Sequence, residues 1–161
     1  MSTSMFIYSS FHVMFAVIIM GGGIFNAWIL DPATNKSLSP PEAGKLGSAV
    51  GKVWMMTALT SEVIILISGF LMLWKLDVLN SDLLDTTYGQ LALGKIAVIA
   101  LWLVTSAIIV AGAMKVEKLS SASPPPGEEI KATVGRMKLM SKINNVSGVI
   151  AILMAVAMRL Q

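Results

Sequence analysis

Three ionisable residues lie inside long apolar segments of the sequence. They are His12, which is the only histidine, Glu62 and Lys95. An ionisable group near the centre of a bilayer costs about 2.5 to 3.5 kcal/mol on insertion scales, so such residues usually face protein and have a polar partner. In a membrane protein, these three residues are therefore the first candidates for a functional site.

Each of the three also has a structural interpretation. His12 could hydrogen-bond across helices, as intramembrane polar residues commonly do. Lys95 could extend its ammonium group outward to the lipid headgroups. Glu62 could be protonated and hydrogen-bonded to Thr60, Ser61 or a neighbouring helix. Residue type alone leaves the structural and functional interpretations open.

Methionine could add copper ligands, because its thioether binds Cu(I) and the chain has 12 methionines. None lies three or four residues from His12, so none is its neighbour one turn away on the same helix. Packing is therefore the favoured role of the methionines. The sequence has no cysteine, which excludes disulfides, thiolate metal sites and cysteine nucleophiles.

Four apolar segments must position these residues. The chain is 55% hydrophobic and 13% charged, whereas soluble domains average about 45–50% and 25%. A spanning helix needs about 20 mostly apolar residues, and only helices or closed barrels pair every backbone group in lipid. We expect an all-α integral membrane protein, a single four-helix bundle over residues 1–161, with spans at about 6–30, 50–74, 91–114 and 143–158. The first has no Lys or Arg before it, so we interpret it as a retained span and not as a signal peptide.

The basic residues predict the orientation, because cytoplasmic loops carry an excess of Lys and Arg. One side of the predicted membrane holds only Lys75 and Arg159. The other side holds Lys36, Lys45, Lys52, Lys115, Lys118, Lys131, Arg136, Lys138 and Lys142. Both termini should therefore be extracytoplasmic, in a multi-pass protein of the cell membrane. This placement explains the net charge of +3 without a nucleic-acid partner.

Proline clusters begin both predicted cytoplasmic helix extensions. Ser39 and Glu42 flank Pro40 and Pro41 as a plausible capping box. In the other loop, prolines at 124–126 precede two glutamates. We expect the second and fourth helices to continue beyond the bilayer.

Other polar and aromatic residues have predicted places along the spans. With the orientation above, His12 and Lys95 reach a similar depth in the outer half of the membrane. Asn144 and Asn145 lie at the start of the fourth span. Interfacial aromatic residues commonly anchor a span, and we expect this role of Trp28, Trp54 and Trp74. We expect the small residues Gly21, Gly22, Gly23, Gly47, Gly51 and Gly69 to permit close helix packing.

Two motifs resemble those of a known family. His12 early in the first span is followed by the glycines at 21–23 and by Phe25, and residues 86–95 read T-T-Y-G-Q-L-A-L-G-K, including Tyr88 and Lys95. These features resemble the CopD-like (copper resistance D) membrane domain family, to which the HemJ-type protoporphyrinogen oxidases are related. The Ser68–Gly69 pair and residues 136–145 are similar to the family more loosely.

The resemblance implies a four-helix unit for copper handling or, in the HemJ branch, for haem and porphyrin oxidation. It implies His12 and Lys95 as a cofactor-binding pair, with His12 as the metal ligand. The chain departs from the family in having no second histidine. A haem held by two histidines of one chain is therefore excluded, and Met, Lys95 or a partner chain would supply the second ligand.

Three functions follow as alternatives. The leading one is a CopD-like protein that assists copper handling as an accessory subunit of a larger copper-dependent membrane complex, without catalytic activity of its own. The second is a HemJ-like porphyrinogen oxidase with b-type haem. The third is a purely structural subunit of a membrane complex. The expected partners are the lipid bilayer and either other membrane subunits or further copies of the chain.

Overall fold

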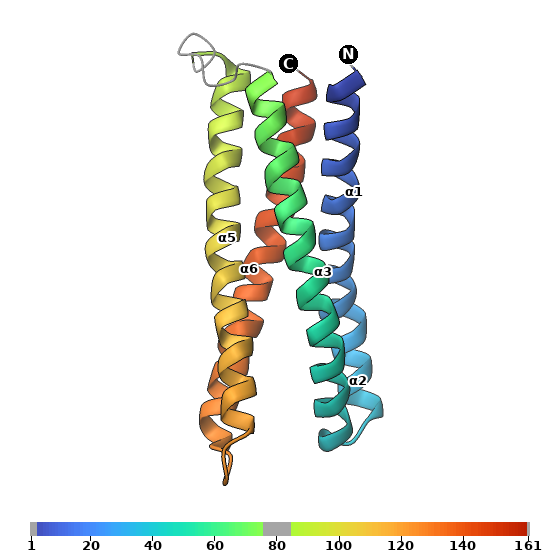
Figure 1. Cartoon of the computed structure of the whole chain (residues 1–161), viewed down its shortest axis with the longest axis vertical. Coiled ribbons are helices and arrows are strands. Elements are labelled where there is room, and N and C mark those ends of the chain that lie inside the picture. The colour runs from blue at the N-terminus through green and yellow to red at the C-terminus, as the bar shows by residue number, and fades with distance from the viewer. Residues whose placement is uncertain (1–2, 76–84, 161) are drawn as a thin grey trace. The chain divides into compact units, whose positions relative to one another are not determined.

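The computed structural model describes residues 3–75 and 85–160, which are almost entirely helical. Their order is α1 (Thr3–Phe25), the π-helix η1 (Asn26–Leu30), α2 (Asp31–Ser37), α3 (Pro40–Lys75), α5 (Thr87–Ser120) and α6 (Gly127–Arg159). The chain divides into two compact units, Met1–Leu83 and Leu84–Gln161. In the first unit, the consecutive segments α1, η1 and α2 form a hairpin with α3. In the second unit, α5 forms a hairpin with α6 (Figure 1).

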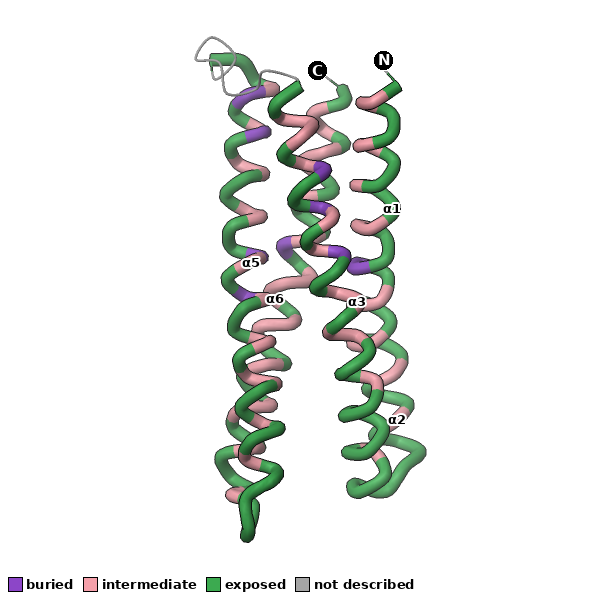
Figure 2. The backbone as a smooth tube through the Cα atoms, viewed as in Figure 1, coloured by how far each residue is buried: buried purple, intermediate pink, exposed green. Residues whose placement is uncertain are grey.

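Four helices in the described residues are long and apolar enough to cross a membrane. They are Thr3–Ser37, Pro40–Lys75, Thr87–Ser120 and Gly127–Arg159. Few of their residues are buried (Figure 2). Large apolar side chains are exposed, such as those of Trp28 (78% exposed) and Trp74 (73% exposed). Such a surface fits contact with lipid, so the chain has the helices of a multi-pass membrane protein.

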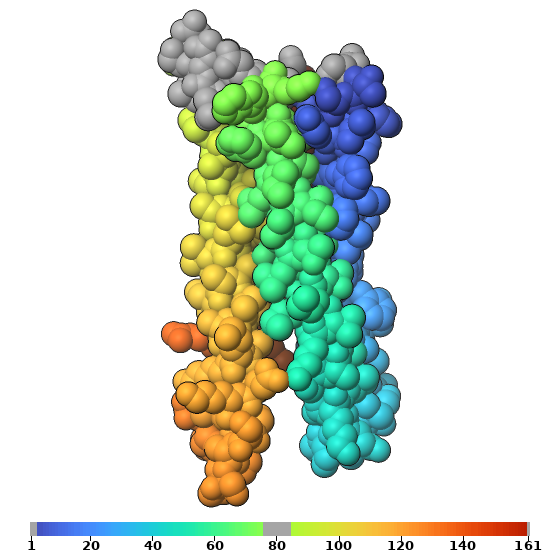
Figure 3. Space-filling model, in the orientation of Figure 1, coloured from blue at the N-terminus to red at the C-terminus, as the bar shows by residue number. Residues whose placement is uncertain are grey.

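The first hairpin is held together at three levels. Near its open end, Lys75 donates a hydrogen bond to the hydroxyl of Ser4. Further along, His12 contacts Ile65, and the glycine at 22 lies against the ring of Trp54. The side chains of α1 and α3 lie against one another in the space-filling view (Figure 3).

The turn of this hairpin ends with the predicted helix start. The backbone N–H of Ser39 donates to Glu42 Oε2 over 3.0 Å, and the Ser39 hydroxyl donates to the same oxygen over 2.5 Å. The carboxylate thus forms its half of the predicted capping box, and α3 begins at Pro40, as predicted. At 36 residues, α3 is roughly 54 Å long, well beyond the hydrocarbon thickness of about 30 Å.

The π-helix follows from a proline one turn later. Pro32 stands at the start of α2, and in a regular helix its ring would clash with the carbonyl group of Trp28, four residues earlier. Here the N–H of Asp31 instead donates to the carbonyl oxygen of Asn26, five residues back. The wider turn accommodates the proline, so the first helix continues past residue 30 to Ser37.

The second hairpin has a defined start and a defined turn. Thr86 caps α5, because its hydroxyl oxygen accepts a hydrogen bond from the N–H of Gly89 over 3.1 Å. Near the turn, Lys115 forms an ion pair with Glu129 over 2.8 Å. The last helix begins at Gly127, directly after the prolines, as the sequence predicts.

All four helices are longer than the apolar spans expected from sequence. The fourth differs most, since residues 143–158 are only the second half of α6. The apolar spans are thus embedded in helices that continue beyond a bilayer core.

Candidate functional site

His12 is held against α3 by its ring. Its Nδ1 atom lies 3.1 Å from the carbonyl oxygen of Ile65 and 3.1 Å from the hydroxyl oxygen of Ser68. His12 is half-buried, whereas Ile65 and Ser68 are buried. At about 1.5 Å per residue, His12 is roughly 14 Å along the helix axis from Thr3. The only histidine is therefore anchored within the apolar part of the hairpin.

Ser68 and Gly69 form the surface on which this ring rests. The Ser68 hydroxyl donates to the carbonyl oxygen of Ile64 over 2.6 Å and is 3.1 Å from that of Ile65. A Cβ atom at Gly69 would lie 3.2 Å from Cε1 of His12 and 3.5 Å from Nδ1. The glycine thus permits the close approach of the imidazole to α3, as predicted for this position.

The other predicted ionisable residues occupy separate places. Glu62 is half-buried on α3, three residues before Ile65. Lys95 and Tyr88 are half-buried on α5, in the second hairpin. The structure joins His12 to α3, and its pairing with Lys95 remains a prediction.

Asn144 is the centre of a polar contact in the second hairpin. Its Nδ2 group lies 3.0 Å from the carbonyl oxygen of Trp102, 2.9 Å from Thr105 Oγ1 and 3.0 Å from Ser106 Oγ. Trp102 and Thr105 are buried. The amide therefore links α6 to α5, which is the role that intramembrane polar side chains commonly have. Asn145 is half-buried beside it on α6.

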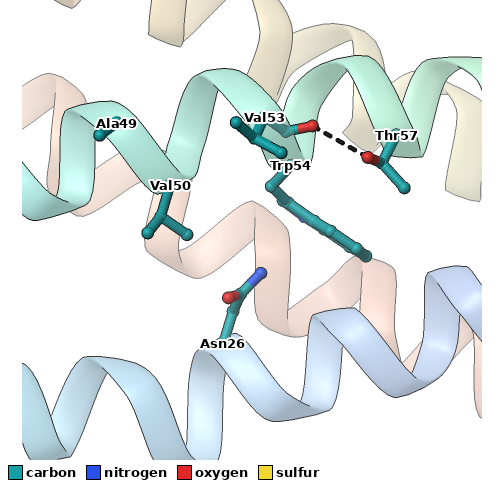
Figure 4. A pocket seen from close by; sticks show the side chains of 6 residues that line it. All are labelled: Asn26, Ala49, Val50, Val53, Trp54 and Thr57. Atoms are coloured by element: carbon teal, nitrogen blue, oxygen red, sulfur yellow. Dashed lines mark hydrogen bonds between the residues drawn. The ribbon is translucent and has the colours of Figure 1, made fainter.

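A groove of about 390 Å³ lies between η1 and α3. Its lining residues are Asn26, Ala49, Val50, Val53, Trp54 and Thr57. Asn26 points from η1 toward α3, and Val50 and Trp54 point back toward it (Figure 4). Thr57 donates its hydroxyl hydrogen to the carbonyl oxygen of Val53 over 3.0 Å. The groove is open and mostly apolar, so it offers few polar groups to a ligand.

Trp54 has a different role from the one expected. A Cβ atom at Gly22 would lie 2.1 Å from Cζ3 and 2.2 Å from Cη2 of Trp54. The ring therefore packs onto α1, while Trp28 and Trp74 remain exposed as anchoring residues would be. No described atom lies within 4 Å of a Cβ built at Gly21, Gly47 or Gly51, so these three glycines create no close contact in the hairpin.

The donor set of this region contains one strong metal ligand, His12. Across residues 3–75 and 85–160, no three His, Asp or Glu side chains gather to hold a metal ion. His12 can supply one imidazole ligand to a metal ion.

The sequence did not indicate the residues that His12 and Asn144 contact on the neighbouring helix. Trp102, Thr105 and Ser106 were not expected to receive Asn144, although the neighbouring hydroxyl residues at 105–106 are a detectable signal in an apolar span. The sequence cannot indicate that His12 contacts the carbonyl oxygen of Ile65, because every residue has a backbone carbonyl group.

The chain matches no protein-family model, no curated protein and no solved structure. Its class rests on its own features: within residues 3–75 and 85–160, four apolar helices have spanning length and belong to two hairpins.

Proposed function

We propose that this chain is a CopD-like integral membrane protein that assists copper handling as an accessory subunit of a larger copper-dependent complex, with His12 as a metal ligand. The hydrogen bond from His12 Nδ1 to the carbonyl oxygen of Ile65 carries the proposal. Metal-ligating histidines almost always donate their second ring N–H to a carboxylate, a backbone carbonyl group or water. His12 has this arrangement within an apolar helix pair.

The donor set fits one imidazole ligand. A copper ion held by His12 would need softer or additional ligands, such as a methionine thioether or groups of a partner chain. The proposal therefore includes a partner chain, either in a larger complex or in a homo-oligomer. Lys95 is the second proposed residue of the site, which requires that the two hairpins associate as a four-helix bundle.

The distribution of charge supports the proposed orientation in each hairpin separately. The turned end of the first hairpin carries Lys36 and Lys45, and its open end carries Lys75. The turned end of the second carries Lys115 and Lys118, and its open end carries Arg159. By the positive-inside rule, both turns are cytoplasmic and both termini are extracytoplasmic, in the cell membrane.

A b-type haem is the second candidate, in a HemJ-like porphyrinogen oxidase. Haem iron can be held by a single proximal histidine, and hydrogen bonding to the ligand tunes the iron. The anchored ring of His12 is therefore as suitable for an axial haem ligand as for copper.

The test compares wild-type protein with the variants His12→Asn and Tyr8→Phe, each purified in mild detergent. An Asn side-chain nitrogen can take the place of Nδ1 and keep the bond to Ile65, but it removes the second ring nitrogen. Tyr8→Phe changes a polar residue one turn away on α1 and is the matched control. Cu(I) affinity is measured by competition with a chromophoric chelator, and absorption spectra are recorded after growth with a haem precursor.

The expected result is copper binding by the wild type and by Tyr8→Phe, with an affinity at least tenfold lower in His12→Asn. A Soret band that is present in the wild type and absent in His12→Asn would show that His12 binds haem, and the second candidate would then replace the first. Equal copper binding by all three proteins, without a Soret band, would contradict both candidates. A purely structural subunit of a membrane complex would then remain.

A further inference from the structure

One face of α6 is basic along its first half and apolar along its second half. Side chains that follow one another at spacings of three, four or seven residues lie on the same side of a helix. On α6 this spacing joins six exposed side chains, which form the outer face of the helix: Lys131, Lys138, Lys142, Val146, Val149 and Leu153. Residues 130–161 contain no Asp or Glu. The outer face thus combines positive charge with exposed apolar surface.

The outer face points away from α5. The residues of α6 that contact α5 lie on the opposite side: Met137 lies against Gly112, and Asn144 Nδ2 donates a hydrogen bond to Thr105 Oγ1. Lys142 is two residues from Asn144, and a helix turns by about 100° per residue, so their side chains lie about 200° apart around the axis. Packing within the second hairpin therefore leaves the outer face uncovered.

The contacts with α5 also place two of the lysines at the edge of the apolar surface. Lys138 directly follows Met137, which contacts α5 at position 112. Lys142 is two residues before Asn144, which contacts α5 at position 106. The stretch of α5 at the level of the two lysines, residues 106–112, has no charged side chain. A bilayer that covers this stretch brings both ammonium groups to the level where hydrocarbon meets the headgroups, because the long lysine stem extends the charge toward water.

We propose that the outer face of α6 binds an anionic phospholipid, with the phosphate group held by Lys138 and Lys142 and an acyl chain lying along the apolar half of the face. Side chains four residues apart are neighbours on a helix, so both ammonium groups can reach one phosphate group. Clusters of basic residues beside a span are typical binding sites for anionic headgroups. A phospholipid matches the order of the face, because its phosphate lies next to hydrocarbon as the lysines lie next to apolar side chains.

Arg136 provides the matched control for this site. It is exposed and lies two residues before Lys138, so it is at nearly the same level but about 200° around the helix. Lys138→Gln, Lys142→Gln and Arg136→Gln each remove one positive charge, and glutamine is about as good a helix former as lysine or arginine. A loss of binding confined to the two lysine variants therefore reports a site and not the net charge.

The affinity is measured by titrating the full-length protein in detergent with phosphatidylglycerol or phosphatidylcholine of the same acyl chains and counting bound lipid by native mass spectrometry. We expect the wild type to bind phosphatidylglycerol at least tenfold more tightly. Each lysine variant should lose about fivefold in this affinity, the contribution of one cation near a membrane surface. Arg136→Gln should change it by less than twofold. Equal affinity for the two lipids, or an equal loss in Arg136→Gln, would overturn the proposal.

A second measurement locates the acyl chain. Phosphatidylglycerol with a photoactivatable group in its acyl chain is added to phosphatidylcholine vesicles that contain the protein, and the crosslinked peptides are identified. We expect crosslinks at residues 146–153 of α6. Crosslinks confined to other segments would mean that the first hairpin or a second copy of the chain covers this face, and would also overturn the proposal. Neither measurement involves copper or haem, so the result is independent of the proposed function.

Discussion

The indole ring of Trp54 fills the space that any side chain at Gly22 would occupy. The nearest ring atom lies 2.1 Å from the place of a Cβ atom, far inside van der Waals contact. α1 and α3 can pack at this level only because residue 22 is glycine. The contact lies between the level of His12 and the turn of the hairpin, so it sets the spacing of the two helices near the groove.

Gly22→Ala should destabilise the first hairpin by about 1 to 3 kcal/mol, the usual cost of forcing atoms into a packed contact. Either the rigid ring of Trp54 must swing out or the helices must separate. Gly21→Ala is the matched control, since nothing lies within 4 Å of its Cβ position. Denaturant titration in micelles, followed by tryptophan fluorescence, measures both; equal stability of the two variants would contradict the assigned contact.

Asn144→Leu should destabilise the second hairpin by about 1 to 2 kcal/mol, because hydrogen bonds between membrane helices are worth about that much. The change removes the donor to Trp102, Thr105 and Ser106 while keeping a similar volume. Asn145→Leu is the control. Hydrogen exchange read by mass spectrometry should show faster exchange in α5 and α6 for Asn144→Leu only. Equal exchange in both variants would contradict the stabilising role of the Asn144 hydrogen bonds.

Lys115→Ala should change the stability of the protein by less than about 1 kcal/mol. The Lys115–Glu129 pair is short, but both side chains are about half exposed, at 53% and 49%, so water screens the attraction. Thermal unfolding at low and high salt checks this expectation. A larger loss that persists at high salt would mean that the pair is shielded from solvent, for example by a partner chain.

Single cysteines can test the proposed orientation, because the chain has none of its own. Thr3→Cys should react with a membrane-impermeant maleimide added to intact cells. Ser37→Cys and Ser123→Cys lie at the two turns and should react only after the membrane is opened. The three positions are exposed, so reactivity reports their side of the membrane. The opposite labelling pattern would invert the topology.

Helix number and type were predictable from the sequence, whereas side-chain partners were not. Length and hydropathy are sufficient for spanning helices, and Ser39 and Glu42 mark a helix start through local geometry alone. Partners across helices depend on how each helix is rotated about its axis. A helix that is apolar on all sides has no polar face to indicate that rotation.

Trp54 and His12 illustrate the difference. An aromatic residue near a membrane interface favours a lipid-facing position on average, but the glycine opposite Trp54 offers a protein surface instead. The position of His12 in the first span was evident, and its use of a backbone oxygen on α3 required the register of two helices. The sequence thus predicted His12 as a candidate site residue, but it did not predict the contacts of its side chain.

The π-helix at Asn26–Leu30 also acts as a change of phase along the first helix. One extra residue in a turn rotates everything after it by about 100° relative to an unbroken α-helix. The face that carries His12 is therefore not continued by the usual three- and four-residue spacing into α2. Deleting one residue from this stretch would bring the two segments back into phase, so the length of the stretch determines which side of α2 faces α3.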